Sequence, residues 1–125
     1  MMRRWIGGLI VLLGGMVLAA PALPATKGDP QAGKAIYTRL CAPCHGESGK
    51  GDGPAAANLP DKPQDFTDAS ALGKATDQDL FNVIKNGGAV VGKSKFMVPF
   101  GSKLSDADIR NLVSYIRTFS KSRSR

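Results

Sequence analysis

The 125-residue sequence predicts an all-α domain in which three or more short helices and long loops wrap around one bound group. Three segments combine capping residues with apolar side chains at helical spacing, at residues 29–45, 76–88 and 105–119. No alternating run of apolar and polar residues is long enough for a strand. The two connections, 46–75 and 89–103, are long, and the expected apolar core is small. Both observations indicate a buried cofactor around which the loops fold.

Residues 1–25 have the composition of a secretory signal. Arg3 and Arg4 form a charged start, an apolar run follows, and the segment ends in small residues and prolines. We expect cleavage at a point between Ala20 and Ala25. An uncleaved membrane anchor is the alternative, although several glycines and two prolines weaken this run as a membrane span.

The domain itself is expected over residues 26–120, followed by a basic, disordered tail at residues 121–125. The formal net charge of the chain is +7, and a basic excess remains without the leader. In an exported protein, this charge favours acidic protein surfaces as partners. Nucleic acid is not expected as a partner, because the sequence has no basic stretch interleaved with aromatic residues.

The first expected helix begins with a favourable pair of residues. Asp29 is a good N-cap, and Pro30 suits the first helical position. Apolar residues then recur at four-residue spacing, at Ala32, Ile36 and Leu40.

The other two expected helices both begin with a pattern like a capping box. Thr76 with Asp79 opens one of them, and Ser105 with Asp108 opens the other. Gly87 and its neighbouring glycine end the earlier helix. The later helix carries a regular apolar stripe, made of Ile109, Leu112, Val113 and Ile116.

The stretch CAPCH, residues 41–45, holds the only two cysteines and the only histidine of the chain. A zinc site, a disulfide, a redox dithiol and a haem anchor all use such clusters. Structural zinc normally needs four ligands from two clusters, and thioredoxin-like dithiols accompany alternating strands and helices. Cys–x–x–Cys–His is the signal for c-type haem attachment. We therefore predict one haem c, joined by thioether links to Cys41 and Cys44, with His45 as an iron ligand.

Met97 is the expected second axial ligand. It is the only methionine outside the leader, His45 is the only histidine, and both cysteines are used for attachment. Met97 also lies in a loop just before the last helix, which can fold over the opposite haem face. The alternatives are a methionine that fills a gap in the core, ligation by lysine, and an open sixth position.

With these residues in place, the sequence resembles the small class I c-type cytochromes over about residues 28–119. The stretches that carry the resemblance are GDPQAGKAIY, CAPCHGESGKGDGP, PQDFTD and FMVPFGSKLSDADIRNLVSYIRTF. The resemblance implies a cytochrome c fold with the methionine ligand before the last helix. Most bacterial relatives read Met-Pro-x-Phe-Gly, whereas this chain reads MVPFG, with Pro99 one place later.

The resemblance also implies two details of the packing. The backbone carbonyl of Pro54 would accept a hydrogen bond from the second imidazole nitrogen of His45. The first and last helices would cross, with Gly33 allowing their close approach and with Tyr37 and Tyr115 nearby.

Two further groups of residues are expected around the haem. Three phenylalanines are expected to pack in its pocket or against the loops: Phe66, Phe96 and Phe100. Four lysines flank the methionine loop and would either guide an acidic partner or form an ordinary solvated surface: Lys85, Lys93, Lys95 and Lys103.

The expected function is transfer of one electron between periplasmic or membrane redox partners of a respiratory chain, such as a dehydrogenase or a terminal oxidase. The sequence shows no nucleophile with a base, no recognisable pair of acid/base carboxylates and no phosphate loop, so we expect a carrier and not an enzyme. A haem enzyme or ligand sensor with an open sixth position, and a fixed subunit of a dehydrogenase or oxidase, are the alternatives.

The expected location is the periplasm. In c-type maturation the haem is joined outside the cytoplasm, so the chain should cross the membrane unfolded through the general secretory route. Arg3–Arg4 therefore need not be a twin-arginine signal. A membrane-anchored form that faces the periplasm is the alternative, and only that form would associate with the membrane.

Overall fold

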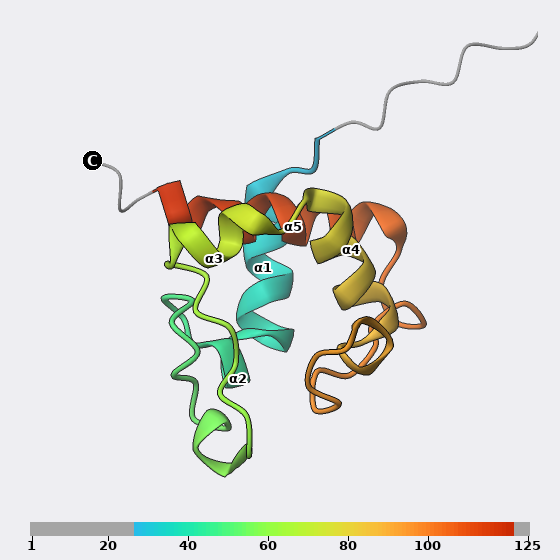
Figure 1. Cartoon of the computed structure of the whole chain (residues 1–125). Helices are drawn as coiled ribbons and strands as arrows, with labels where there is room; N and C mark the ends of the chain where they lie inside the picture. Colours follow the sequence, from blue (N-terminus) through green and yellow to red (C-terminus); the bar gives the residue numbers. More distant parts are fainter. Residues whose placement is uncertain (1–26, 122–125) are drawn as a thin grey trace, which may run out of the picture.

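The computed structural model describes residues 27–121, and this part of the chain is helical without a strand (Figure 1). The predicted all-α fold is therefore confirmed. The leader and residues 122–125 lie outside the described residues, while Lys121, predicted to start the tail, is the last residue of a helix. The elements are α1 (Pro30–Leu40), α2 (Ala42–His45), the 3-10 helix η1 (Ala56–Asn58), α3 (Ala69–Lys74), α4 (Asp77–Asn86), the 3-10 helix η2 (Ala89–Val91) and α5 (Asp106–Lys121).

The crossing of α1 and α5 is the centre of the fold. In Figure 1, α5 runs across the top of the molecule and α1 passes beside it, while α2 and the long connections lie below. A Cβ atom on Gly33 would collide with the backbone carbonyl of Asn111, so only glycine permits this approach. The rings of Tyr37 and Tyr115 lie nearby, with centroids 5.2 Å apart. This part of the prediction is confirmed.

The predicted first helix, residues 29–45, is in fact two helices. α1 ends at Leu40, and the chain turns at Cys41 before α2 begins. The physical reason is Pro43, which has no N–H to donate and whose ring would clash with the carbonyl of Arg39 in a continuous helix. At the second helical position of α2 the same proline is acceptable.

The two predicted capping boxes are present at α4 and α5. The Asp79 N–H donates to the Thr76 hydroxyl oxygen over 3.1 Å, and the Thr76 N–H donates back to the Asp79 carboxylate over 2.8 Å. Ser105 and Asp108 make the same reciprocal pair, with both distances 3.1 Å. These boxes fix where the two best-predicted helices begin.

α3 was not predicted, because residues 46–75 read as one long loop. It is a helix of six residues, capped by the Asp68 carboxylate, which accepts from the N–H groups of Ser70 and Ala71. A helix this short is not stable through local interactions alone. Leu72, which is 2% exposed, anchors it in the core.

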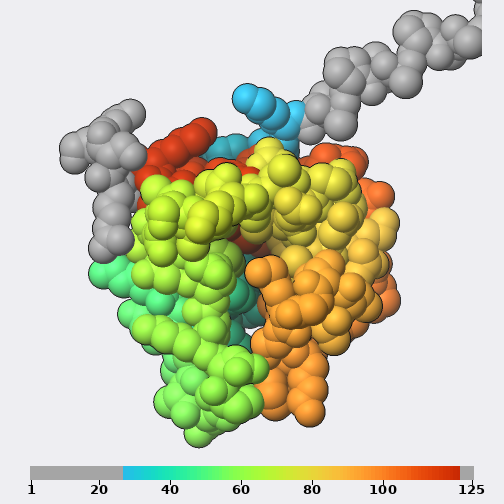
Figure 2. All heavy atoms as spheres, viewed as in Figure 1, coloured from blue at the N-terminus to red at the C-terminus, as the bar shows by residue number. Residues whose placement is uncertain are grey.

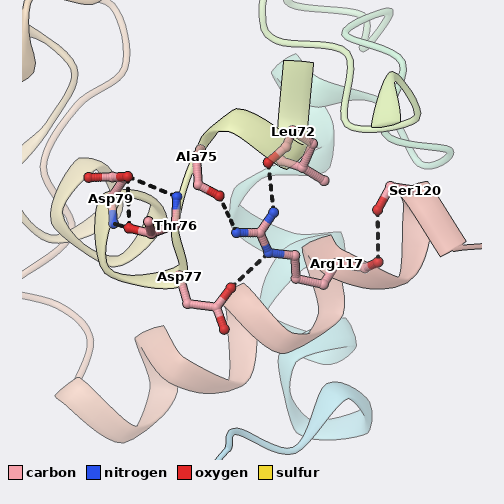
Figure 3. A network of polar contacts seen from close by, with 7 residues as sticks. All are labelled: Leu72, Ala75, Thr76, Asp77, Asp79, Arg117 and Ser120. Atoms are coloured by element: carbon pink, nitrogen blue, oxygen red, sulfur yellow. Dashed lines mark hydrogen bonds and ion pairs between the residues drawn. The ribbon is translucent and has the colours of Figure 1, made fainter. Parts of the chain in front are cut away.

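Arg117 of α5 holds α3 and the start of α4 together (Figure 3). Its guanidinium donates to the carbonyl of Leu72 over 2.7 Å, to the carbonyl of Ala75 over 2.5 Å and to the carboxylate of Asp77 over 2.8 Å. The first two acceptors lie in the last turn and at the C-cap of α3, where the carbonyl of Leu72 also accepts from the N–H of Ala75 over 3.3 Å. One side chain therefore satisfies the end of one helix and joins it to the next.

Replacing Arg117 with methionine is expected to lower the free energy of unfolding by about 2–3 kcal/mol, since hydrogen bonds from a charged donor contribute about 1.5–3 kcal/mol. Urea unfolding of the haem-loaded protein measures this loss. Arg39→Met is the matched control, because Arg39 is exposed on α1, and its loss should cost less than about 0.5 kcal/mol. Equal effects of the two variants would contradict the role of Arg117.

Candidate functional site

The CAPCH segment is held by the loop that follows it. The loop folds back so that the N–H of Gly51 donates to the carbonyl of His45 over 2.7 Å, and the N–H of Gly53 donates to that of Cys44 over 3.1 Å. These carbonyls end α2 and would otherwise be unpaired. On the other side, the Tyr37 hydroxyl donates to the carbonyl of Gly46 over 2.8 Å in a buried contact. The motif is thus fixed to α1 and to its own loop.

The imidazole of His45 is placed as a neutral ligand requires. Burial lowers its pKa, an effect partly offset by a backbone hydrogen bond with Gln64. A neutral imidazole has a free lone pair for a metal ion at neutral pH. The carbonyl oxygen of Gln64 lies 3.4 Å from Nδ1, which leaves Nε2 as the nitrogen that can reach an iron atom.

The partner of His45 differs from the expected one. The resemblance assigned this role to Pro54, but Pro54 is exposed and the structure gives the Nδ1 contact to Gln64. The loop after His45 explains this difference, because its fold-back brings residues 63–66 against the motif. The N–H of Phe66 donates to the carbonyl of Gly49 over 2.7 Å, and a Cβ on Gly51 would collide with the carbonyl of Pro63.

Cys41 and Cys44 are both free thiols in the structure, and both border the same cavity as His45. Cys41 is buried, and this burial, with a smaller contribution from Cys44, raises the pKa of its thiol to about 12. Such a thiol is almost entirely protonated and weakly nucleophilic at neutral pH. Burial therefore keeps the Cys41 thiol in its neutral form.

Met97 is carried by a loop that is tied to the end of α4. The N–H groups of Phe100 and Gly101 donate to the carbonyls of Ile84 and Lys85, both over 2.9 Å. The carbonyl of Met97 accepts from the N–H of Gly88 over 2.8 Å. The loop thus pairs with carbonyl groups at the end of α4, and its position is fixed at Met97 and directly after it.

One cavity of about 960 Å³ brings Cys41, Cys44, His45 and Met97 together. Figure 2 shows a hollow bordered by the green connection after α2 and by the orange segment that contains residue 97. Its volume is at the upper end of the range for small-molecule sites, about 300–1,000 Å³. Much of the remaining wall is apolar, including Leu40, Leu59, Leu72, Leu80, Val83, Ile84, Phe100 and Ile116.

These residues fit a haem c. Two thiols border a large and mostly apolar cavity, and a neutral imidazole and a thioether border it from separate segments. Haem iron accepts both of these ligands. Zinc has no comparable site in the described range, since residues 27–121 contain no group of three or more His, Cys, Asp or Glu side chains placed to hold a metal ion.

The predicted phenylalanines have different environments. Phe66 is buried and borders the cavity, and Phe100 also borders it, whereas Phe96 is 44% exposed at its rim. The contacts of Gln64 and Phe66 with His45 were not predicted. Both residues belong to the stretch PQDFTD, which carries part of the resemblance, and that stretch is the sequence signal that could have indicated them.

Segment 90–98 carries four exposed apolar side chains, here named the apolar patch, and sequence reasoning missed them. They are Val90, Val91, Phe96 and Val98, which are 42–68% exposed, and the last two also border the cavity. Lys93 and Lys95 lie between these residues in the chain and also border the cavity. Lys85 is instead paired with the carboxylate of Asp106 over 2.8 Å.

No helix within residues 27–121 is both long and apolar enough to cross a membrane.

Known proteins match both the sequence and the fold. The family model described as "Cytochrome C oxidase, cbb3-type, subunit III" matches residues 28–116. The cbb3-type cytochrome c oxidase subunit FixP of Azorhizobium caulinodans is 36% identical in an alignment of 91 residues that covers 70% of this chain. This chain spans only 28% of the length of FixP.

Two solved structures share the fold. The KustC0563 c-type cytochrome superposes with a TM-score of 0.58 and 28% identity, over 70% of this chain and 95% of its own. A chain of the Kuenenia stuttgartiensis reducing HAO-like protein complex Kustc0457/Kustc0458 gives a TM-score of 0.64 and 28% identity, over 82% of this chain and 47% of its own. The family model covers all five α-helices at least in part. The members of this family are electron-transfer proteins with covalently bound haem c. This chain therefore belongs to the family of c-type cytochrome domains typified by subunit III of the cbb3 oxidases.

Proposed function

We propose that this chain carries one electron at a time through a single haem c, linked to Cys41 and Cys44 and ligated by His45 and Met97. The observation that carries the proposal is the cavity that these four side chains share. The chain has only two cysteines, which is one attachment motif and hence one haem. When bound, haem c supplies a one-electron iron couple, and ligation by histidine and methionine raises its potential.

The roles of the protein groups follow from the geometry. His45 presents Nε2, with Nδ1 directed to the carbonyl of Gln64 instead of that of Pro54. Met97 approaches on a loop fixed to α4. The largely apolar wall suits the ring system of a haem, and two protein ligands would leave no iron position for a substrate. A carrier therefore fits this geometry better than a haem enzyme or ligand sensor.

The test is a redox titration of the purified haem protein, followed by its ferric spectrum. A near-infrared band from sulfur-to-iron charge transfer, with a clearly positive potential, would support ligation by Met97. A high-spin iron, no such band and a strong response to carbon monoxide or azide would instead support the open-site alternative.

We also propose that partners dock on the apolar patch beside the cavity. Residues 80–105 contain four lysines and no acidic residue, so the segment that carries the patch is basic. Charge complementarity favours a redox protein with an acidic rim around an apolar contact, such as a dehydrogenase or a terminal oxidase. FixP is an oxidase subunit by name, and this supports the further possibility of a fixed subunit in such a complex.

Steering by these lysines predicts a measurable effect on rate. Oxidation of the ferrous protein by ferricyanide, a small anionic redox probe, should slow as ionic strength rises. Lys93→Glu combined with Lys95→Glu should lower the rate at low salt by about tenfold. Lys34→Glu on α1 combined with Lys121→Glu on α5 is the control, because it changes the net charge equally at exposed residues that do not border the cavity, and it should have a much smaller effect. Equal slowing in both proteins would show that only the net charge matters.

The location is proposed to be the periplasm, reached by the general secretory route. The composition of residues 1–25 supports this proposal, and the same residues would form the membrane anchor if they are retained.

A further inference from the structure

We propose that Phe66 is a positioning residue, which fixes the plane of the His45 imidazole and so the orientation of an axial ligand. This inference rests on the proposed ligation of iron by His45. The two rings are stacked, with centroids 4.6 Å apart and planes inclined by only 12°. The phenyl ring therefore lies against the face of the imidazole.

Phe66 can act in this way because it is itself immobilised. It is 7% exposed, and its N–H donates to the carbonyl of Gly49 over 2.7 Å. Its ring is nearly parallel to that of Phe119 of α5, with centroids 6.4 Å apart and planes at 18°. The edge of Tyr37 of α1 approaches it as well, at 6.5 Å. Phe66 therefore packs between His45 and the aromatic side chains of α1 and α5, so the position of these two helices determines where the phenyl ring meets the imidazole.

The contact complements the one at Nδ1. The carbonyl of Gln64 restrains the imidazole at its edge, but at 3.4 Å that hydrogen bond is long. An edge contact of this kind permits a range of rotation about the bond that joins the ring to Cβ. A flat ring packed on one face opposes that rotation directly. Residues 64–66 thus restrain both the direction and the plane of the ligand.

The plane of the imidazole has an electronic consequence. The π orbital of the ring is perpendicular to its plane, so it overlaps with only one of the two iron orbitals of matching symmetry. With iron bound at Nε2, the angle of the ring would contribute to the splitting between these orbitals, together with the second ligand, and the spacing of the ferric g-values in electron paramagnetic resonance would report a change in that angle. The g-value spacing therefore distinguishes a change in ligand orientation from a loss of stability. A loss of core packing that leaves the imidazole plane in place does not alter the g-values.

The test compares Phe66→Leu with Phe119→Leu in the haem-loaded protein. Both remove the same ring from the same aromatic group, but only Phe66 stacks on His45. We expect both variants to unfold at lower urea concentration. We expect only Phe66→Leu to change the spacing of the g-values or to broaden the signals into a range of ligand angles. Phe66→Tyr, which keeps the ring, should restore the wild-type spacing.

Unchanged g-values in Phe66→Leu, or equal changes in both leucine variants, would overturn the inference. If Phe66→Leu does not accumulate as a haem protein, Phe66→Met gives the same comparison, because methionine fills the space without a flat ring. Failure of the proposed ligation is recognised separately, because the wild-type protein would then lack the low-spin spectrum of histidine–methionine iron.

Discussion

Replacing Met97 with alanine is expected to abolish the near-infrared band of the ferric protein and to lower its reduction potential. A thioether sulfur stabilises ferrous iron, whereas water or a lysine amine in its place favours ferric iron. A tenfold change in the relative stability of the two oxidation states corresponds to about 59 mV for a one-electron couple. We expect a fall of at least this size, measured by redox titration in parallel with the absorption spectrum.

Val98→Ala is the matched control for this experiment. Val98 is the next residue in the same loop and is 52% exposed, so its truncation tests the effect of altering the loop without removing sulfur. The hydrogen bonds from Phe100 and Gly101 to the end of α4 should hold the loop in both variants. The potential and the band of Val98→Ala should match the wild type. A Met97→Ala protein that also matches the wild type would exclude Met97 as a ligand.

The elements that sequence reasoning predicted are those whose stability has a local cause. α4 and α5 each begin at a capping box formed by residues three apart, and α5 carries a continuous apolar stripe. The candidate site was also predictable in outline, because its cysteines and histidine are adjacent and only one methionine remains outside the leader. In each case the deciding residues are close in sequence or limited in number.

The features that were missed depend on contacts between distant parts of the chain. α3 has one turn and a half, and it depends on Leu72 in the core and on Arg117, 45 residues away. The Nδ1 partner of His45 is 19 residues away, at Gln64, and was misassigned to Pro54 because the return of the loop cannot be read from spacing. The break at Cys41 is different, since Pro43 is visible in the sequence and its clash with a continuous helix was overlooked.

Gly33→Ala is expected to cause the largest loss of stability among single-methyl changes in α1. The added Cβ would meet the backbone carbonyl of Asn111, and a backbone group within a helix cannot move aside as the end of a side chain can. Overpacking of a core costs typically 1–3 kcal/mol, and we expect about 3 kcal/mol here. Urea unfolding measured at constant haem content gives this value.

Gly73→Ala is expected to have the opposite effect on the free energy of unfolding, and it is made as a separate single change in the wild-type chain. Gly73 lies within α3, has no heavy atom within 4 Å of the position of an added Cβ, and has no positive φ. Alanine should therefore stabilise the protein by about 0.5–1 kcal/mol, because glycine within a helix is destabilising relative to alanine. Both glycines lie within helices, and they differ in what surrounds them. If the free energy of unfolding falls in Gly33→Ala and rises in Gly73→Ala, the loss at Gly33 is due to the close contact between α1 and α5.

The Gly33→Ala substitution should also disturb the haem site. The reason is that α1 leads directly into Cys41 and that α5 contributes Ile116 to the cavity wall. Separating the two helices moves the attachment motif relative to that wall, whereas the Met97 loop is held mainly by α4. We therefore expect the near-infrared band of Gly33→Ala to weaken at urea concentrations well below those that unfold the wild type. A Gly33→Ala protein as stable as the wild type would mean that α1 and α5 do not approach closely enough to require glycine.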